Sequence, residues 1–138
     1  MNRTDFQQLA DIRIDEAAVL LAQQKWDGAY YLAGYAVECA LKACIAKMTK
    51  QDDFPPYKKF SEDCYSHDLN KLMILAELDD LLDAAMQAEK ALAKNWQTIR
   101  AWDESSRYKR IPQAKAEEMY NAIVDPKHGV LPWLKQYY

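Results

Sequence analysis

Residues 26–43 of this 138-residue chain read WDGAYYLAGYAVECALKA, and this stretch decides the fold. Its small residues recur at spacings of three and four, at Ala29, Ala33, Ala36, Ala40 and Ala43. Residues spaced in this way lie on one face of an α-helix, so the stretch predicts a helix with a narrow face of small side chains. Another helix can approach such a face closely. Large tyrosines flank the face, and Glu38 and Lys42 form a charged pair one turn apart within an otherwise apolar run.

The remainder of the chain is also helical in character. Good helix formers dominate it, and only three glycines and five prolines interrupt them. We expect helices over residues 5–24, 27–48, 67–75, 81–102 and 112–124, with Thr4, Ser66 and Asp79 or Asp80 as N-caps, and a last turn that opens at Pro132. Residues 49–65 contain Pro55-Pro56 and are expected to form a loop. The sequence therefore predicts an all-α fold, an antiparallel up-and-down bundle of four to five helices in a single domain, residues 1–138.

Composition limits the function classes. The net charge of −3 gives no general attraction for nucleic acid, so any contact with RNA must come from a local patch. The three cysteines form no C-x-x-C pair and their number is odd, which favours reduced thiols over a disulfide framework. The chain has no apolar run of about 18 residues and begins MNRTD, without a secretory signal. We expect a cytoplasmic protein that does not enter a membrane.

The Glu38–Lys42 pair is one candidate site. Glu before Lys at a spacing of four is the stabilising order on a helix. One interpretation is a polar position in a groove of the bundle, where Lys42 binds the phosphate of a nucleotide. The alternative is a structural ion pair in which helix 27–48 is held against Arg13 or Arg100.

Residues 96–111, WQTIRAWDESSRYKRI, contain the densest basic cluster of the chain. Basic side chains mixed with aromatic ones are typical of contacts with single-stranded RNA, where cations bind phosphates and rings stack on bases. The candidate ligand-binding residues in this segment are Arg100, Arg107, Tyr108, Lys109 and Arg110. Two acids, Asp103 and Glu104, oppose this interpretation. The alternative is a solvated basic helix end with tryptophans in the core.

His67 and Asp68 are adjacent, and a histidine beside a carboxylate is a candidate general base. Successive residues on a helix point about 100° apart, so the two side chains rarely meet. We expect Asp68 to lie in the first turn of its helix instead, near the positive helix end. The spacing of histidines and cysteines suits no metal site, and no glycine-rich phosphate loop is present, so we expect neither a metal nor a cofactor.

Several stretches together resemble a known family. AYYLAGYAVECALKA at 29–43 is followed by SHDL at 66–69 and Leu72, and the resemblance extends upstream to residues 10–17 and downstream through 102–108 to GVLPWL at 129–134. The chain resembles the HEPN domain (higher eukaryotes and prokaryotes nucleotide-binding) over nearly its whole length. The resemblance implies a helical bundle, a homodimer and, as in many bacterial members, a minimal nucleotidyltransferase as partner in a toxin–antitoxin or defence system.

One part of the family pattern is missing. Ribonuclease members of the HEPN family carry an R-x4-6-H motif, and Arg107 is the natural counterpart of its arginine. The positions for the histidine are occupied by Pro112, Gln113 and Ala114, and no other arginine of the chain has a histidine at that spacing. The resemblance therefore does not imply nuclease activity for this chain.

Three hypotheses remain. The first is a non-catalytic protein that binds RNA or a nucleotide as a homodimer. The second is a metal-independent ribonuclease toxin that uses Arg107 and His67 as catalytic residues in place of the motif. The third is a purely structural interaction module. A homodimer is expected because a small bundle cannot easily hide its large aromatic residues, Tyr30, Tyr31, Tyr35, Trp102, Trp133, Tyr137 and Tyr138.

Overall fold

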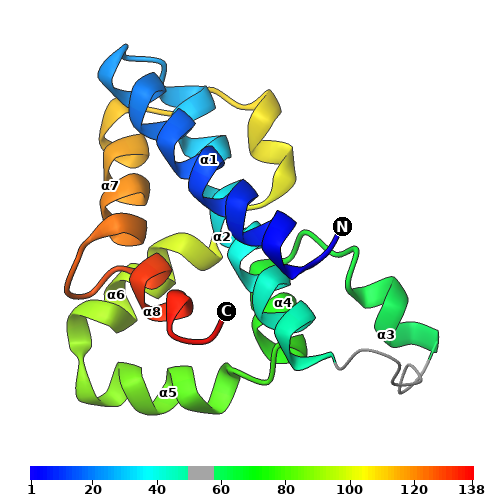
Figure 1. The fold of residues 1–138 in the computed structure, drawn as a ribbon. Coiled ribbons are helices and arrows are strands. Elements are labelled where there is room, and N and C mark those ends of the chain that lie inside the picture. Colours follow the sequence, from blue (N-terminus) through cyan, green and yellow to red (C-terminus); the bar gives the residue numbers. More distant parts are fainter. Residues whose placement is uncertain (50–57) are drawn as a thin grey trace.

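The chain folds into helices, as the computed structural model of residues 1–49 and 58–138 shows (Figure 1). In chain order the elements are α1 (Arg3–Ala22), α2 (Trp26–Met48), α3 (Lys58–Asp63), α4 (Leu69–Leu75), α5 (Asp79–Ala88), α6 (Lys90–Arg100), the 3-10 helix η1 (Glu104–Tyr108), α7 (Gln113–Val124) and α8 (Val130–Lys135). No strand occurs within these described residues. The all-α prediction is confirmed, whereas the described part has eight α-helices instead of four to five.

Helices α1 and α2 form an antiparallel hairpin. The predicted face of small residues on α2 is buried, with Ala33, Ala36 and Ala40 at 0% exposure. Ala10 and Ala17 of α1 are buried to the same degree, so small residues meet small residues and the two backbones come close. Helix α1 begins two residues earlier than expected, because Asn2 caps it. The Asn2 side chain accepts a hydrogen bond from the Asp5 amide at 2.9 Å, and the Asp5 carboxylate accepts one from the Asn2 amide.

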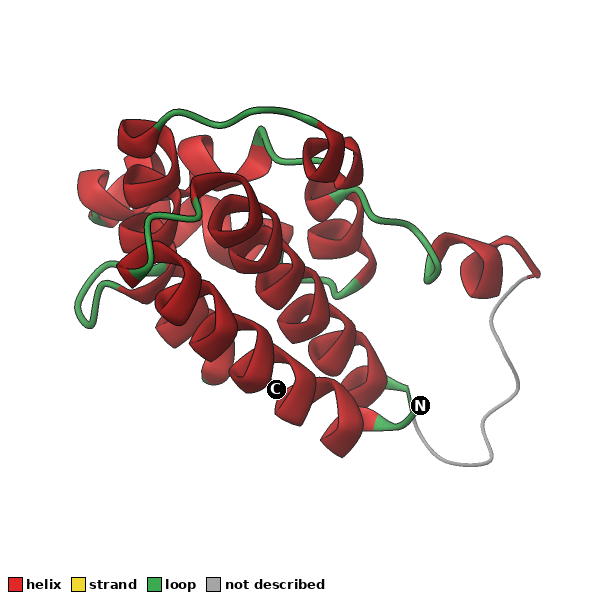
Figure 2. Ribbon diagram, turned by 90° about the horizontal axis from the view of Figure 1, so that it is seen from above, coloured by secondary structure: helices red, strands yellow, loops and turns green. Residues whose placement is uncertain are grey.

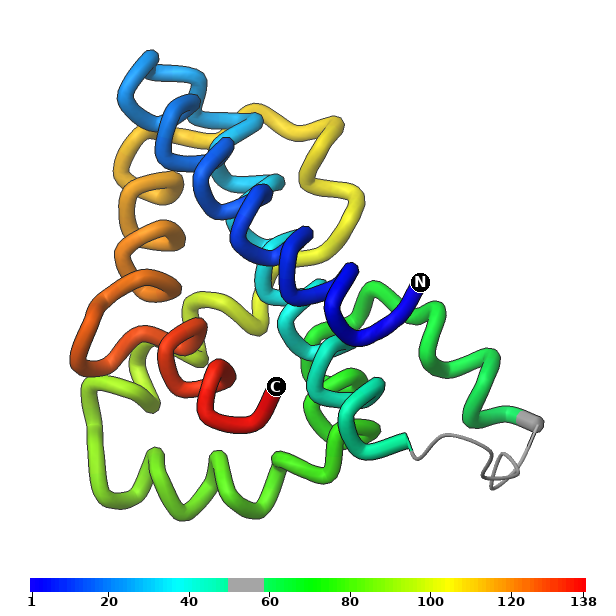
Figure 3. Tube along the Cα trace, in the orientation of Figure 1, coloured from blue at the N-terminus to red at the C-terminus, as the bar shows by residue number. Residues whose placement is uncertain are grey.

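Helix α2 is the centre of the molecule. It packs against α1, α4, α7, α8 and η1 (Figures 1 and 3). This central position explains why α2 has buried residues on every side, and it matches the predicted span of 27–48 within one residue. The end of α8 returns to the start of α1, where the Arg3 side chain donates to the carbonyl oxygen of Tyr138 at 2.9 Å.

The predicted helix over 81–102 is wrong as a single element. The chain turns at Glu89, whose φ of −128° and ψ of 99° are extended, and α5 and α6 point in different directions (Figure 1). No proline or glycine marks this corner. The packing explains it, since the buried side chains of α5 and α6, Leu82 on one and Trp96 on the other, face the same core from two helices.

The expected loop at 49–65 and the helix after it also differ from the structure. Residues 58–63 form α3, which packs against α4 and extends away from the other helices (Figure 2). Pro55-Pro56 lie outside the described residues. Helix α4 begins at Leu69 and not at His67, because the Asp68 side chain caps it by accepting from the Lys71 amide at 3.1 Å. Asp68 is thus the cap, and His67 precedes the helix.

The later helix ends agree more closely. Pro112 is the N-cap of α7 instead of its first residue, and α7 ends at Val124, before Asp125-Pro126. Helix α8 begins at Val130, two residues before Pro132. Across the part of the chain that the structure describes, no helix is both long and apolar enough to cross a membrane.

Candidate functional site

A buried carboxylate links α2 to the segment before α4. Glu38 is 2% exposed; its Oε1 lies 2.9 Å from Nδ1 of His67, and its Oε2 lies 3.3 Å from Nζ of Lys42. The predicted Glu38–Lys42 pair is confirmed, but its expected partners are wrong. Arg13 pairs with Glu16 at 2.7 Å, and the third member of the Glu38–Lys42 cluster is His67.

The turn before α4 holds His67 in place. Ser66 Oγ accepts from the Asp68 amide at 3.1 Å, and Asp68 caps the helix, so the backbone on both sides of His67 is fixed. Leu69 and Leu72 are buried and fasten α4 to α2. The His67 side chain nevertheless remains 47% exposed. With Nδ1 directed at Glu38, Nε2 is the ring nitrogen that has no protein partner among the described residues.

His67 lies on the wall of a pocket of about 410 Å³. Its lining combines the turn before α4 with the end of α6 and the start of η1, and consists of Ser66, His67, Asp68, Arg100, Ala101, Trp102, Asp103 and Glu104. Arg100 is exposed here and makes no ion pair with any described residue. One guanidinium and one imidazole therefore border the same cavity.

Three carboxylates share this lining, and two of them already bind the protein. Asp68 caps α4. Asp103 caps η1, because its carboxylate accepts hydrogen bonds from the Ser105 amide at 2.8 Å and from the Ser105 hydroxyl. The bond from the hydroxyl, and to a smaller degree the bond from the amide, lowers the pKa of Asp103 below its usual value. Glu104 has no ion-pair partner among the described residues. The lining of the pocket thus has mixed charge, because Arg100 shares it with three carboxylates.

Trp102 forms the inner wall of the pocket. It is 3% exposed, and its ring centroid lies 6.0 Å from that of Tyr31. The indole lies directly on the backbone of α2 at Gly34, where a Cβ would overlap the ring. Nε1 of Trp102 has no hydrogen-bond partner among the described residues. Trp96 is equally buried, so neither tryptophan offers a ring to a base, contrary to the expectation for 96–111.

The structure separates the predicted basic cluster. Arg100 borders the His67 pocket, whereas Arg110 lies 3.6 Å from Asp27 and borders a second cavity of about 530 Å³ beside Lys25. Lys109 lies 4.0 Å from Asp103. Arg100 and Arg110, which are close in sequence, therefore border different cavities.

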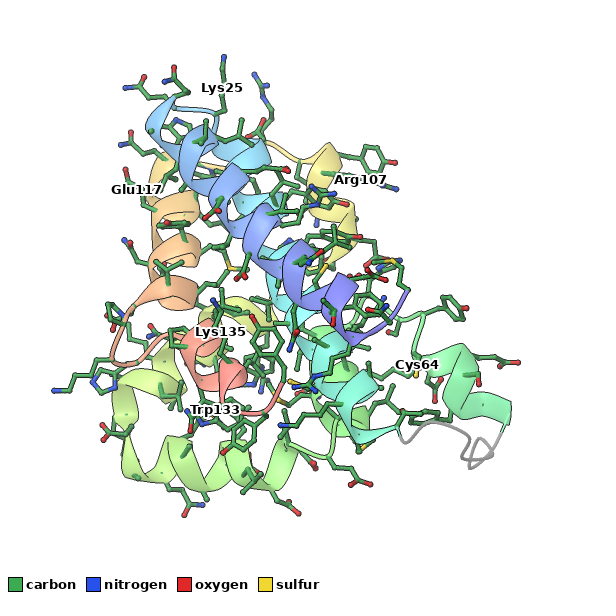
Figure 4. All side chains as sticks on the ribbon, viewed as in Figure 1. Lys25, Cys64, Arg107, Glu117, Trp133 and Lys135 are labelled. Atoms are coloured by element: carbon green, nitrogen blue, oxygen red, sulfur yellow. The ribbon has the colours of Figure 1, made fainter. Side chains whose placement is uncertain are left out.

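Arg107 and Tyr108 form a smaller exposed unit. The Arg107 guanidinium lies over the Tyr108 ring, 4.8 Å from its centroid, and Tyr108 is 78% exposed. Arg107 points outward from η1 (Figure 4). It does not border the pocket that contains His67, so the structure pairs His67 with Arg100 and not with Arg107.

No protein-family model, curated protein or solved structure matches this chain.

The chemistry of the site rests on the imidazole and the charged groups and not on a thiol. Cys39 follows Glu38 in the chain, and burial, with the nearby Glu38 carboxylate adding to it, raises the pKa of its thiol to about 11. Cys39 is therefore protonated and a poor nucleophile at neutral pH. No group of three histidine, cysteine, aspartate or glutamate side chains in residues 1–49 and 58–138 is arranged to hold a metal ion.

Sequence reasoning missed the central contact of the site. It singled out Glu38, His67 and Arg100 separately, and it considered His67 with Arg107, and Glu38 with Arg13 or Arg100, only as alternatives. A signal existed: Glu38 is a charge on the apolar face of a core helix, and such a charge requires a partner. The sequence did not show that the partner stands 29 residues later.

Proposed function

We propose that this chain is a HEPN-like protein that binds RNA or a nucleotide at the pocket of His67 and Arg100. The observation that carries the proposal is that an exposed guanidinium without an acidic partner among the described residues and an oriented imidazole border one cavity of about 410 Å³. A guanidinium binds phosphate oxygens in a bidentate way, and Nε2 of His67 supplies a further polar contact.

Arg107 and Tyr108 extend the proposed site along η1. A phosphate contact by Arg107 and stacking of a base on the exposed Tyr108 ring are the interactions that single-stranded RNA uses on proteins. The acids of the pocket lower its affinity for a dense polyphosphate. The proposal therefore favours a single-stranded RNA or a nucleoside monophosphate over a nucleoside triphosphate.

The assembly of the protein is part of the same proposal. The sequence-based argument for a homodimer weakens, because Tyr30 and Trp102 are buried within one chain. Other apolar side chains take their place at the surface: Ile12 is 47% exposed and Val19 63% exposed, both on α1. We propose a homodimer through this face, with a nucleotidyltransferase partner in a toxin–antitoxin or defence system as the wider context. Light scattering that finds a 16 kDa monomer at high concentration would refute the dimer.

Fluorescence anisotropy with a labelled single-stranded RNA that is 2′-O-methylated throughout tests the binding. Arg100→Ala is expected to weaken binding by about tenfold, the usual effect of losing one charge-assisted contact. Lys94→Ala removes another exposed cation of the same helix outside the pocket and serves as the matched control. Wild-type affinity should fall as salt rises. The proposal fails if the wild-type protein does not bind at low salt, or if both variants bind as wild type does.

A further inference from the structure

We propose that the pocket of His67 and Arg100 selects guanine among the four RNA bases, and that Glu104 determines this specificity. Its carboxylate accepts hydrogen bonds from N1–H and from the 2-amino group of guanine. The inference rests on the proposed function, because a nucleotide must first bind in the pocket. It goes beyond binding as such, since it names the base that the pocket prefers and the side chain that recognises it.

The lining of the pocket has more acidic groups than a site for phosphate alone requires. A phosphate group engages Arg100, but the carboxylates of the lining repel it. Two of these carboxylates bind the protein itself, since Asp68 accepts from the Lys71 amide and Asp103 from Ser105. The third, Glu104, accepts a hydrogen bond from no described residue. A free carboxylate beside a bound phosphate is favourable only if the same ligand also brings donors to it.

Arg100 and Glu104 border one cavity with opposite charges, yet they form no ion pair with each other. They are four positions apart, the spacing at which two charges meet on a helix. Here α6 ends at Arg100, and the 3-10 helix η1 begins at Glu104 after a break at 101–103, so the helical spacing does not apply. Both charges are therefore available to a ligand with an anionic group and a donor group, and a nucleotide has both.

His67 adds a second acceptor to the pocket wall. An ionised carboxylate only accepts hydrogen bonds, so the 2.9 Å contact with Glu38 places a proton on Nδ1 of His67. In the neutral ring Nε2 is then an acceptor. Beside the cation Arg100, the groups of the lining that remain free for a base are thus an acceptor nitrogen and a carboxylate.

Guanine is the base whose donors match a carboxylate best. It carries N–H groups on two adjacent positions, N1 and the 2-amino nitrogen, and these can meet the two oxygens of one carboxylate side by side. Adenine and cytosine offer one amino group, and uracil offers one ring N–H. Bases of single-stranded RNA expose these edges to proteins. The second hydrogen of the 2-amino group has Nε2 of His67 as a further acceptor.

Fluorescence anisotropy with four short 2′-O-methyl RNAs tests the base preference. One is oligouridine, and the others carry a single central guanosine, adenosine or inosine. Guanosine is expected to tighten binding by about 5–150-fold over oligouridine, the usual range for a base read by two hydrogen bonds. Adenosine should add little. Inosine keeps N1–H but lacks the 2-amino group, so its affinity should lie between those of adenosine and guanosine.

Glu104→Gln tests the carboxylate. The amide keeps the shape of the side chain but loses the charge and one acceptor, so the preference for guanosine should fall to about twofold or less. Oligouridine should bind as before or more tightly, because a negative charge beside its phosphates is gone. Arg100→Ala should weaken both oligomers alike and keep their ratio. Glu77→Gln changes an exposed acid outside the pocket lining and is the matched control, which should behave as wild type.

Three results would overturn the inference. Equal affinity of the wild-type protein for oligouridine and the guanosine oligomer would refute guanine selection and leave the proposed binding function intact. Equal tightening of both oligomers in Glu104→Gln would show a carboxylate that only repels phosphate. Absence of binding to any of the four RNAs would refute the proposed function and the inference with it. If melting curves show that Glu104→Gln does not fold, inosine still decides in the wild-type protein, since binding as tight as that of guanosine refutes a contact to the 2-amino group.

Discussion

Gly34 is expected to be the least replaceable small residue of α2. A Cβ at this position would overlap the indole of Trp102, and the overlap involves ring atoms and not the tip of a flexible side chain. The ring cannot easily move away, since it is 3% exposed and lies against Tyr31. Gly34→Ala therefore forces either the indole or the η1 segment to shift.

Two opposing terms set the size of the effect. Alanine favours the helix over glycine by about 1 kcal/mol. Overpacking a rigid core contact reduces stability by about 1–3 kcal/mol, and the upper end applies here because both sides are rigid. The net expectation for Gly34→Ala is a loss of about 1–2 kcal/mol, and a domain of this size then melts lower by about 4–8 °C. Gly34→Leu should lose more, because a larger side chain must enter the same space.

Thermal and urea denaturation measure the change, and Gly28→Ala on the same helix is the matched control. A Cβ at Gly28 would lie 3.1 Å from Cδ1 of Leu20, the mobile end of a side chain, so this variant should be as stable as wild type or more so. In a Trp102→Ala background, Gly34→Ala should become neutral or stabilising, with a coupling energy of about 1–3 kcal/mol between the two sites. An unchanged melting temperature for Gly34→Ala, or the same loss in both backgrounds, would refute the argument.

Three further outcomes are expected. Lys42→Met should lower the free energy of unfolding by about 1–3 kcal/mol in urea denaturation, because it leaves the buried Glu38 carboxylate with only one of its two partners. The double variant with Glu38→Gln should recover part of this loss. Wild-type stability should fall as pH rises from 9 towards 11, because the Cys39 thiol ionises near its ordinary pKa of 9.0 in the unfolded chain but has a pKa of about 11 in the native state. In Cys39→Ala the stability should fall less steeply with pH. Arg107→Ala should change stability by less than about 0.5 kcal/mol, since the side chain is exposed, while it weakens RNA binding in the anisotropy assay.

Local patterns predicted the helices whose ends depend on nearby residues. Helix α2 follows from the spacing of its alanines, and α7 from the proline before it and the Asp125-Pro126 that follows. The corner at Glu89 could not be predicted in this way. The residues around it have good helix propensity. The segment forms two helices because Leu82 and Trp96 are both buried in the same core.

The candidate site shows the same limit. Side-chain types singled out Glu38, His67 and Arg100 as candidates, but the grouping of these residues depends on how distant segments pack. The sequence placed Arg100 and Arg110 in one cluster because they are ten residues apart. The bend through η1 carries them to different cavities, which residue spacing alone does not reveal.

The contact between Asp27 and Ile111 has a consequence for the motions of the protein. The Asp27 carboxylate, at the start of α2, accepts a hydrogen bond of 2.6 Å from the Ile111 amide, 84 positions later in the chain. This one bond fastens the end of the irregular segment between α6 and α7, which carries η1 and one wall of the pocket. The Ile111 amide proton is consequently a reporter: its exchange with deuterated solvent requires that Asp27 release it, so its protection follows how often this segment detaches from the central helix.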